Sequence, residues 1–182
     1  MRFFGLGAQV MQKLGVSTQL LAAADIYQAL ERGVIDATEF SMPMMDIKLG
    51  FHQIAKFNYF PGWHQQVSCG ELLMNKKAWE ALPEAYKAMI ETAGEAQIAF
   101  TYSETEAMQF DAMAEMRGKY QVQVKRWSDK DLAAFEKAWL EVLQEESAKD
   151  PIFKKVADHY LDFRKKYAIW GKAQELKASY LD

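Results

Sequence analysis

The sequence contains little cysteine, proline and histidine, and it has no long apolar run. Its one cysteine, Cys69, excludes an internal disulfide and a zinc site built from cysteines. No apolar stretch approaches the roughly 20 residues of a membrane-spanning helix. The net charge is −3, so no basic field points to nucleic acid or an acidic membrane. Half of the 182 residues are apolar, enough for a core in one domain or two small lobes.

Catalytic signatures are also missing. The sequence contains no nucleophile elbow, no His-Glu-x-x-His helix and no P-loop. The glycine pair Gly5 and Gly7 lacks the third glycine of a dinucleotide-binding loop. Carboxylate pairs such as Glu145 and Glu146 fall on charged helix faces. We therefore expect a protein that is not an enzyme.

Helical and strand-like segments alternate along the chain, which predicts an α/β fold. Strands are expected at 2–4, 16–21, 34–40, 66–74 and 120–124. Helices are expected before Gly15, at 25–32, from Pro43 to about Gly50, and after Ser128, which forms a capping-box pattern with Asp131.

The run from Asp25 to Phe40 predicts a helix, a glycine stop and a short buried strand. Asp25 can cap the helix, and Gly33 supplies the left-handed residue past its end. Glu39 stands where the strand meets a loop, a common position for a ligand-facing group. A lone glutamate is more often a surface residue, but apolar neighbours such as Ile35 indicate partial burial, where an unpaired carboxylate is costly. A hard cation bound by oxygen ligands would remove that cost.

Two long helices complete the pattern. The helix expected at 83–117 has a predicted buried side comprising Tyr86, Met89, Ile90, Ala93, Gln97 and Phe100. The C-terminal helix, of about 30 residues or about 45 Å, carries a seam at alternating steps of three and four. The seam comprises Phe153, Val156, Tyr160, Phe163, Tyr167 and Trp170. It fits packing on the chain's own body and docking on a second subunit.

Four sequence blocks occur in an order that is unlikely to arise by chance. They are Ile26-Tyr-Gln-Ala-Leu-Glu-Arg-Gly-Val-Ile-Asp36, Leu49-Gly-Phe-His52, Phe57-Asn-Tyr-Phe-Pro-Gly-Trp-His64 and Leu73-Met-Asn-Lys-Lys-Ala-Trp-Glu-Ala-Leu-Pro83. Together they resemble the solute-binding proteins of tripartite ATP-independent periplasmic (TRAP) transporters, in the branch that binds 2-oxo acids. The resemblance is close over residues 1–127 and looser beyond. It implies a partial two-lobed periplasmic-binding-protein fold of the class II type, with a long connecting helix and a long C-terminal helix.

The resemblance also implies how the chain is divided. Residues 1–66 and 119–150 would belong to lobe II, and residues 67–118 to lobe I. Residues 151–182 would form the C-terminal helix, a candidate dimerisation element. Members of the family are nearly twice as long, and this chain begins where their second half begins. We therefore expect a fragment of a periplasmic protein, without its N-terminal half and signal peptide.

The resemblance assigns a binding site as well. Arg2 would clamp the ligand carboxylate through paired hydrogen bonds, although a solvated terminal arginine fits the residues alone. A sodium or calcium ion would bridge protein and ligand, held by the Glu39 side chain, the Phe40 carbonyl and Gln65. Phe40 stands where the family often has tryptophan. Phenylalanine keeps an aromatic ring at this position but lacks the indole N–H donor. Trp63 would line the ligand, although aromatic residues in such a position more often pack in the core.

The expected function is capture of a small carboxylate outside the cytoplasm, a 2-oxo acid such as pyruvate, and its delivery to membrane permease subunits. The alternative is a helical dimerisation module that binds no small molecule. A lone histidine rarely ligates metal or senses pH, so His64 receives no role.

Overall fold

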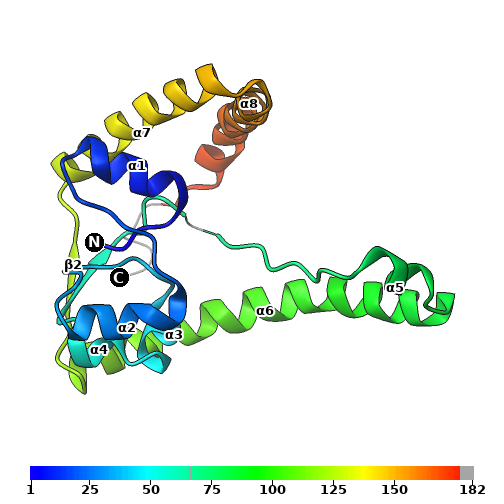
Figure 1. Cartoon of the computed structure of the whole chain (residues 1–182), viewed down its shortest axis with the longest axis horizontal. Coiled ribbons are helices and arrows are strands. Elements are labelled where there is room, and N and C mark those ends of the chain that lie inside the picture. Colours follow the sequence, from blue (N-terminus) through cyan, green and yellow to red (C-terminus); the bar gives the residue numbers. More distant parts are fainter. Residues whose placement is uncertain (66, 177–182) are drawn as a thin grey trace.

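The computed structural model describes residues 1–65 and 67–176. Figure 1 shows one group of helices above a set of short strands, a second group below them, and a long arm that projects from the lower group. The upper group contains α1, α7 and α8, the lower group contains α2, α3 and α4, and the arm contains α5 and most of α6.

Strand pairing in the described residues is parallel throughout. Strand β1 (Phe57–Phe60) pairs with β2 (Gln123–Arg126). Arg2 forms isolated parallel bridges to Gln19 and to Thr38, so three short segments lie side by side with Arg2 in the middle. Parallel neighbours need long crossover connections, which the helices provide. The predicted α/β class is therefore correct.

The individual strands differ from those expected. The segments 2–4, 16–21 and 34–40 pair only at single bridge residues. Strand β1 was not predicted, because the turn signal at Pro61 and Gly62 dominated the aromatic run around it. The described part of the expected strand at 66–74 contains neither helix nor strand, and position 66 lies outside the described residues. This stretch runs alone between the body and the arm, where no neighbouring backbone can pair with it (Figure 1).

Helices α1 (Gly5–Lys13) and α7 (Asp129–Lys149) pack together to form the upper core. Two small clusters hold them, one of Phe3, Met11 and Phe135 and the other of Val10, Ala138 and Val142. The predicted capping box at the start of α7 is confirmed, because the Ser128 hydroxyl accepts from the Asp131 N–H and the Asp131 carboxylate accepts from the Ser128 N–H.

Helices α2 (Ala23–Glu31), α3 (Pro43–Lys48) and α4 (Phe51–Ile54) make the lower group. Its core is a cluster of Ile26, Ile35 and Phe51. The prediction that Asp25 caps α2 is wrong: the helix begins after Ala22 and has no side-chain cap. Asp25 lies in the first turn instead, where its charge favours the helix dipole. Gly33 does adopt the left-handed conformation, with φ 68°.

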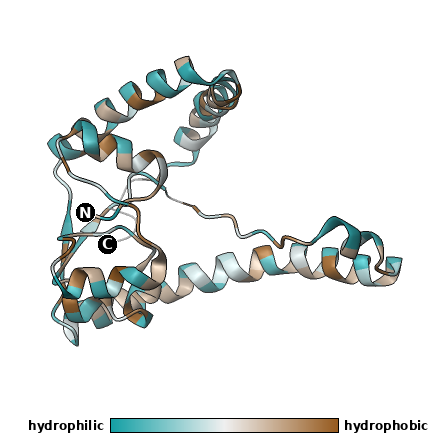
Figure 2. Cartoon of the chain, viewed as in Figure 1, coloured by the Kyte–Doolittle hydropathy of each residue, from teal (hydrophilic) through white to brown (hydrophobic). Residues whose placement is uncertain are grey.

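The arm consists of α5 (Lys76–Glu80) and α6 (Glu84–Gly118). The long helix is as expected, but its predicted buried side is wrong. Tyr86, Met89 and Phe100 are 55%, 64% and 59% exposed. Only Ala112 and Met116, near its C-terminal end, are buried, where α6 packs on α3. The described chain leaves residues 91–104 of α6 uncovered, and the apolar residues among them remain exposed. Figure 2 colours apolar positions along the arm in brown.

The last helix, α8 (Pro151–Gln174), starts at Asp150, whose carboxylate accepts from the N–H groups of Ile152 and Phe153. It contacts α7, and its one buried residue is Ala157. The seam positions from Val156 to Trp170 are more than half exposed, so packing of the seam on the described body is excluded. Residues 177–182 of the expected C-terminal segment lie outside the described residues. None of the described helices combines the length and the apolar character that crossing a membrane would require.

Candidate functional site

The centre of the site is an ion pair between Arg2 and Glu39. Arg2 Nη1 donates to Glu39 Oε1 at 2.5 Å and to the Glu39 carbonyl at 3.0 Å. The side chains are only 10% and 16% exposed. Each of these largely buried charges is neutralised by its partner. The ion pair is therefore part of the interior of the fold rather than a surface contact.

Backbone pairing places these two side chains. The Arg2 N–H donates to the Ala37 carbonyl at 2.9 Å, which fixes the first segment against the third. Glu39 Oε1 also accepts from the Phe4 N–H at 3.0 Å. Arg2 Nε lies 3.4 Å from the Leu21 carbonyl, so all three bridged segments contribute to the site. The sequence prediction that Glu39 is partly buried at the end of a strand-like segment agrees with this geometry.

His64 belongs to the same group of side chains, a placement that the sequence analysis missed. Its Nε2 lies 3.4 Å from Glu39 Oε2, so both carboxylate oxygens of Glu39 face a nitrogen. Its ring contacts Phe3 edge-on, with the ring centroids 4.7 Å apart. No local pattern relates positions 39 and 64, because only the tertiary fold brings them together.

Asp46 is a second carboxylate that the sequence reading passed over. Its Oδ1 is buried and has no hydrogen-bond partner in the part of the chain that the structure describes. Burial raises the pKa of Asp46 from 3.8 to about 6; the backbone of Ser41 opposes this shift and the charge of Glu39 adds to it. An acidic residue in the first turn of a short helix usually signals a helix start, which hid this position.

The remaining predicted residues lie around the pair in different environments. Phe40 packs in the lower core, edge-on to Phe51 with the centroids 5.6 Å apart. Trp63 packs in the upper core, stacked on Phe135 at 4.8 Å, so most of its face serves packing. Gln65 is exposed, and its amide donates to the Ser68 hydroxyl at 2.8 Å.

The proposed donor atoms are all oxygens, the type of ligand that a hard cation prefers. A carboxylate, a backbone carbonyl and an amide oxygen, from Glu39, Phe40 and Gln65, are ligands that sodium and calcium accept. Across residues 1–65 and 67–176, no three His, Cys, Asp or Glu side chains gather closely enough to hold a metal by themselves. Softer transition metals therefore find no such cluster in the described chain.

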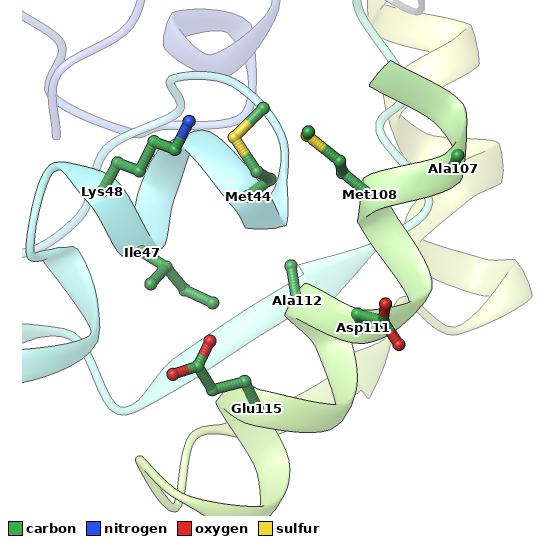
Figure 3. Close-up of a pocket in the computed structure, with 8 residues that line it drawn as sticks. All are labelled: Met44, Ile47, Lys48, Ala107, Met108, Asp111, Ala112 and Glu115. Atoms are coloured by element: carbon green, nitrogen blue, oxygen red, sulfur yellow. The ribbon is translucent and has the colours of Figure 1, made fainter. Parts of the chain in front are cut away.

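A separate groove of about 340 Å³ lies between α3 and α6 at the root of the arm. Figure 3 shows Met44 and Met108 pointing toward one another across it. It is lined by Met44, Ile47, Lys48, Ala107, Met108, Asp111, Ala112 and Glu115. The groove has no buried charged side chain comparable to Arg2, so the Arg2–Glu39 region remains the better candidate for ligand binding.

Residues 1–150 match the family described as bacterial extracellular solute-binding protein, family 7, and the chain belongs to that family. The resemblance to TRAP solute-binding proteins is thereby confirmed. Proteins of this family and the relatives below serve transport and are not enzymes, which agrees with the absence of catalytic motifs.

Three relatives are informative. The monocarboxylate 2-oxoacid-binding periplasmic protein of Nostoc sp. (strain PCC 7120) is 34% identical over 97% of this chain and 48% of its own. A TRAP transporter solute-binding protein from Bordetella bronchiseptica, crystallised as a mixed-occupancy dimer with calcium and picolinate in one site, is also 34% identical. It superposes with a TM-score of 0.84 over 96% of this chain and 52% of its own. The protein from Pseudoalteromonas atlantica, with bound sodium and pyruvate, is 27% identical, with a TM-score of 0.84 over 100% of this chain and 54% of its own.

The chain therefore spans about half the length of these relatives. The expected partial binding-protein fold is confirmed at this level. Membership of an extracellular solute-binding family supports a location outside the cytoplasm.

Proposed function

We propose that this chain is part of a periplasmic TRAP solute-binding protein that captures a small carboxylate, a 2-oxo acid such as pyruvate, and delivers it to membrane permease subunits. The observation that carries the proposal is the Arg2 side chain, 10% exposed and held between bridged segments beside Glu39. A planar guanidinium in a nearly dry setting is well suited to a carboxylate. The pyruvate and picolinate bound by two relatives are both small carboxylates.

The roles of the residues follow the donor chemistry. Arg2 would bind the ligand carboxylate, and Glu39, the Phe40 carbonyl and Gln65 would hold a sodium or calcium ion. Such an ion, when bound, supplies positive charge to the carboxylate and oxo oxygens of the ligand. Trp63 would contribute an edge of its ring, because its face is occupied by Phe135.

The exposed arm supports the proposed division into lobes. Residues 67–118 would belong to lobe I, and residues 1–66 and 119–150 to lobe II. Along α6 the residues 91–104 are exposed on every side, and they include Ile98 and Tyr102 at 73% and 68%. Apolar surface of this extent usually marks a contact surface. In a protein of the relatives' length, the other half would cover it.

A second role, dimerisation, is favoured by α8. Tyr160, Phe163, Tyr167 and Trp170 are 55–60% exposed on one seam of this helix. We propose that this seam docks on a second copy of the chain. The resulting dimer would be a property of the binding protein or, in the alternative function, dimerisation would be the chain's only function. The mixed-occupancy dimer of the Bordetella relative is consistent with the first version.

The test is a thermal melt of the 182-residue chain with pyruvate, lactate or succinate, in sodium or calcium buffer and with chelator. A ligand that binds only the folded state raises the midpoint. We expect pyruvate to raise it, and Arg2→Met to remove the rise. A cooperative melt that no acid shifts would refute carboxylate capture by this chain and leave the assembly role.

A further inference from the structure

We infer that Gln109, on α6, is a positioning residue for the proposed binding site and acts by holding the start of α3. The inference rests on the proposed function, and it adds a residue that acts on the site without touching the ligand. Its basis is a hydrogen bond in which the Met44 N–H donates to Gln109 Oε1 at 3.2 Å. This bond joins positions that are 65 apart in the chain.

Helix α3 needs a hydrogen-bond acceptor that its own sequence does not supply. Its N-cap residue is Met42, which makes no side-chain cap bond. Because Pro43 has no N–H, the Met44 N–H is the first donor of α3 that finds no acceptor within the helix. The Gln109 side chain provides this acceptor from another helix, in the way that a polar N-cap residue would.

A second hydrogen bond holds the Gln109 amide in the orientation that this contact requires. Gln109 Nε2 donates to the Thr105 carbonyl, one turn earlier in α6, at 2.8 Å. With its NH₂ group used in this way, the amide presents its oxygen to the Met44 N–H. Helices α3 and α6 also pack on one another, and Figure 3 shows Met44 facing Met108, the neighbour of Gln109. The contact therefore joins two packed helices.

The stretch of chain from Glu39 to Met44 is consequently fixed at both ends. At its first end, the Glu39 carbonyl accepts from Arg2 Nη1 at 3.0 Å. At its other end, Gln109 holds the Met44 N–H. The Phe40 carbonyl lies on the short stretch between these two anchors, so its direction depends on both of them. A backbone oxygen cannot be aimed by a change of rotamer, and only contacts of this kind can orient it toward a bound group.

The experiment is a calorimetric titration of the full 182-residue chain with pyruvate, in a buffer that contains calcium chloride. Gln109→Met removes the acceptor at similar side-chain size, and we expect pyruvate affinity to fall by about tenfold or more. Gln109→Glu keeps an acceptor oxygen for the Met44 N–H and should restore the parent affinity. Gln97→Met is the matched control, because Gln97 lies on the same helix and donates to the Thr101 hydroxyl instead.

Three results of this titration would overturn the inference while leaving carboxylate capture intact. The first is parent affinity in Gln109→Met. The second is an equal loss in Gln109→Met and Gln97→Met, which would indicate a general effect on α6. The third is an equal loss in Gln109→Met and Gln109→Glu, since the acceptor oxygen would then not matter. No heat from pyruvate in the parent chain would overturn the inference and the proposed function together.

Amide hydrogen exchange of the ligand-free chain tests the hydrogen bond itself. We expect the Met44 amide to exchange faster in Gln109→Met than in the parent chain or in Gln97→Met, because its acceptor is gone. Faster exchange at Met44 together with weaker pyruvate binding supports the positioning role. Faster exchange at Met44 with unchanged pyruvate affinity would assign Gln109 a purely structural role, and that result overturns the inference.

Discussion

Arg2 and Glu39 are 37 positions apart, yet Arg2 Nη1 lies 2.5 Å from Glu39 Oε1. The pair also joins the two halves of the core. Phe3, next to Arg2, belongs to the upper cluster, and Phe40, next to Glu39, packs on the lower one. The contact that would bind a ligand is thus also the contact that aligns the helical groups.

Removing one member of this pair should destabilise the chain. Arg2→Met leaves the Glu39 carboxylate buried without its cation, and we expect a loss of about 2 to 4 kcal/mol in the free energy of unfolding. Urea unfolding measures it. Lys166→Met is the control, because its bond to Asp162 is exposed and should be worth less than about 0.5 kcal/mol. The double variant Arg2→Met/Glu39→Gln should be less destabilised than Arg2→Met alone. If Arg2→Met and Lys166→Met lowered the free energy of unfolding equally, this account would be contradicted.

Asp46 should make stability depend on pH. Its folded pKa of about 6 is raised above the ordinary 3.8, so the folded state binds the proton more tightly than the unfolded state. The free energy of unfolding therefore falls as pH rises from about 4 to about 6, by about 2 to 3 kcal/mol in all. Asp46→Asn should flatten this slope and be more stable than the parent at pH 7.5.

Urea unfolding across pH 4–8 provides the measurement for Asp46. Asp36→Asn, at an exposed position, serves as the control and should retain the parent slope. An unchanged slope in Asp46→Asn would show that the buried carboxylate is not the source of the dependence.

The Gly-x-Gly pair has a structural explanation. A β-carbon on Gly7 would collide with the ring of Phe3, which is 3% exposed in the upper core. Gly7→Ala should therefore cost about 1 to 3 kcal/mol through displacement of that ring. Gly94→Ala is the matched control: it lies within α6, nothing would meet its β-carbon, and it should stabilise the helix by about 0.5 to 1 kcal/mol. Thermal melts of Gly7→Ala and Gly94→Ala test this explanation. If both substitutions shifted the melting midpoint in the same direction, the explanation would be refuted.

The α8 seam predicts concentration-dependent assembly. Phe163 is 58% exposed, so Phe163→Glu should leave the melting midpoint of the monomer nearly unchanged while abolishing any dimer. Sedimentation measured at several protein concentrations shows directly whether the dimer forms. Lys165→Glu lies about 200° around the helix from the seam and should still dimerise. A parent chain that stays monomeric at every concentration would remove the proposal for this seam.

Local features were readable from the sequence because short-range physics fixes them. The capping box at Ser128, the left-handed Gly33 and the start of α3 at Pro43 each depend on a few adjacent residues. The Asp25 cap failed because one more turn of helix formed ahead of it. The buried side of α6 failed for a different reason: periodicity predicts an apolar face but not whether the chain supplies a neighbour to cover it.

By itself the sequence determined the long helices, the α/β class and, through its four ordered blocks, the family. It also marked Glu39 by its neighbours and Arg2 by the family resemblance. Only the tertiary structure decided that these two side chains bond to one another, that His64 faces the same carboxylate and that Asp46 Oδ1 is buried. Those relationships join positions far apart in the chain, and they arise where packed elements exclude water, so no local pattern of residues encodes them.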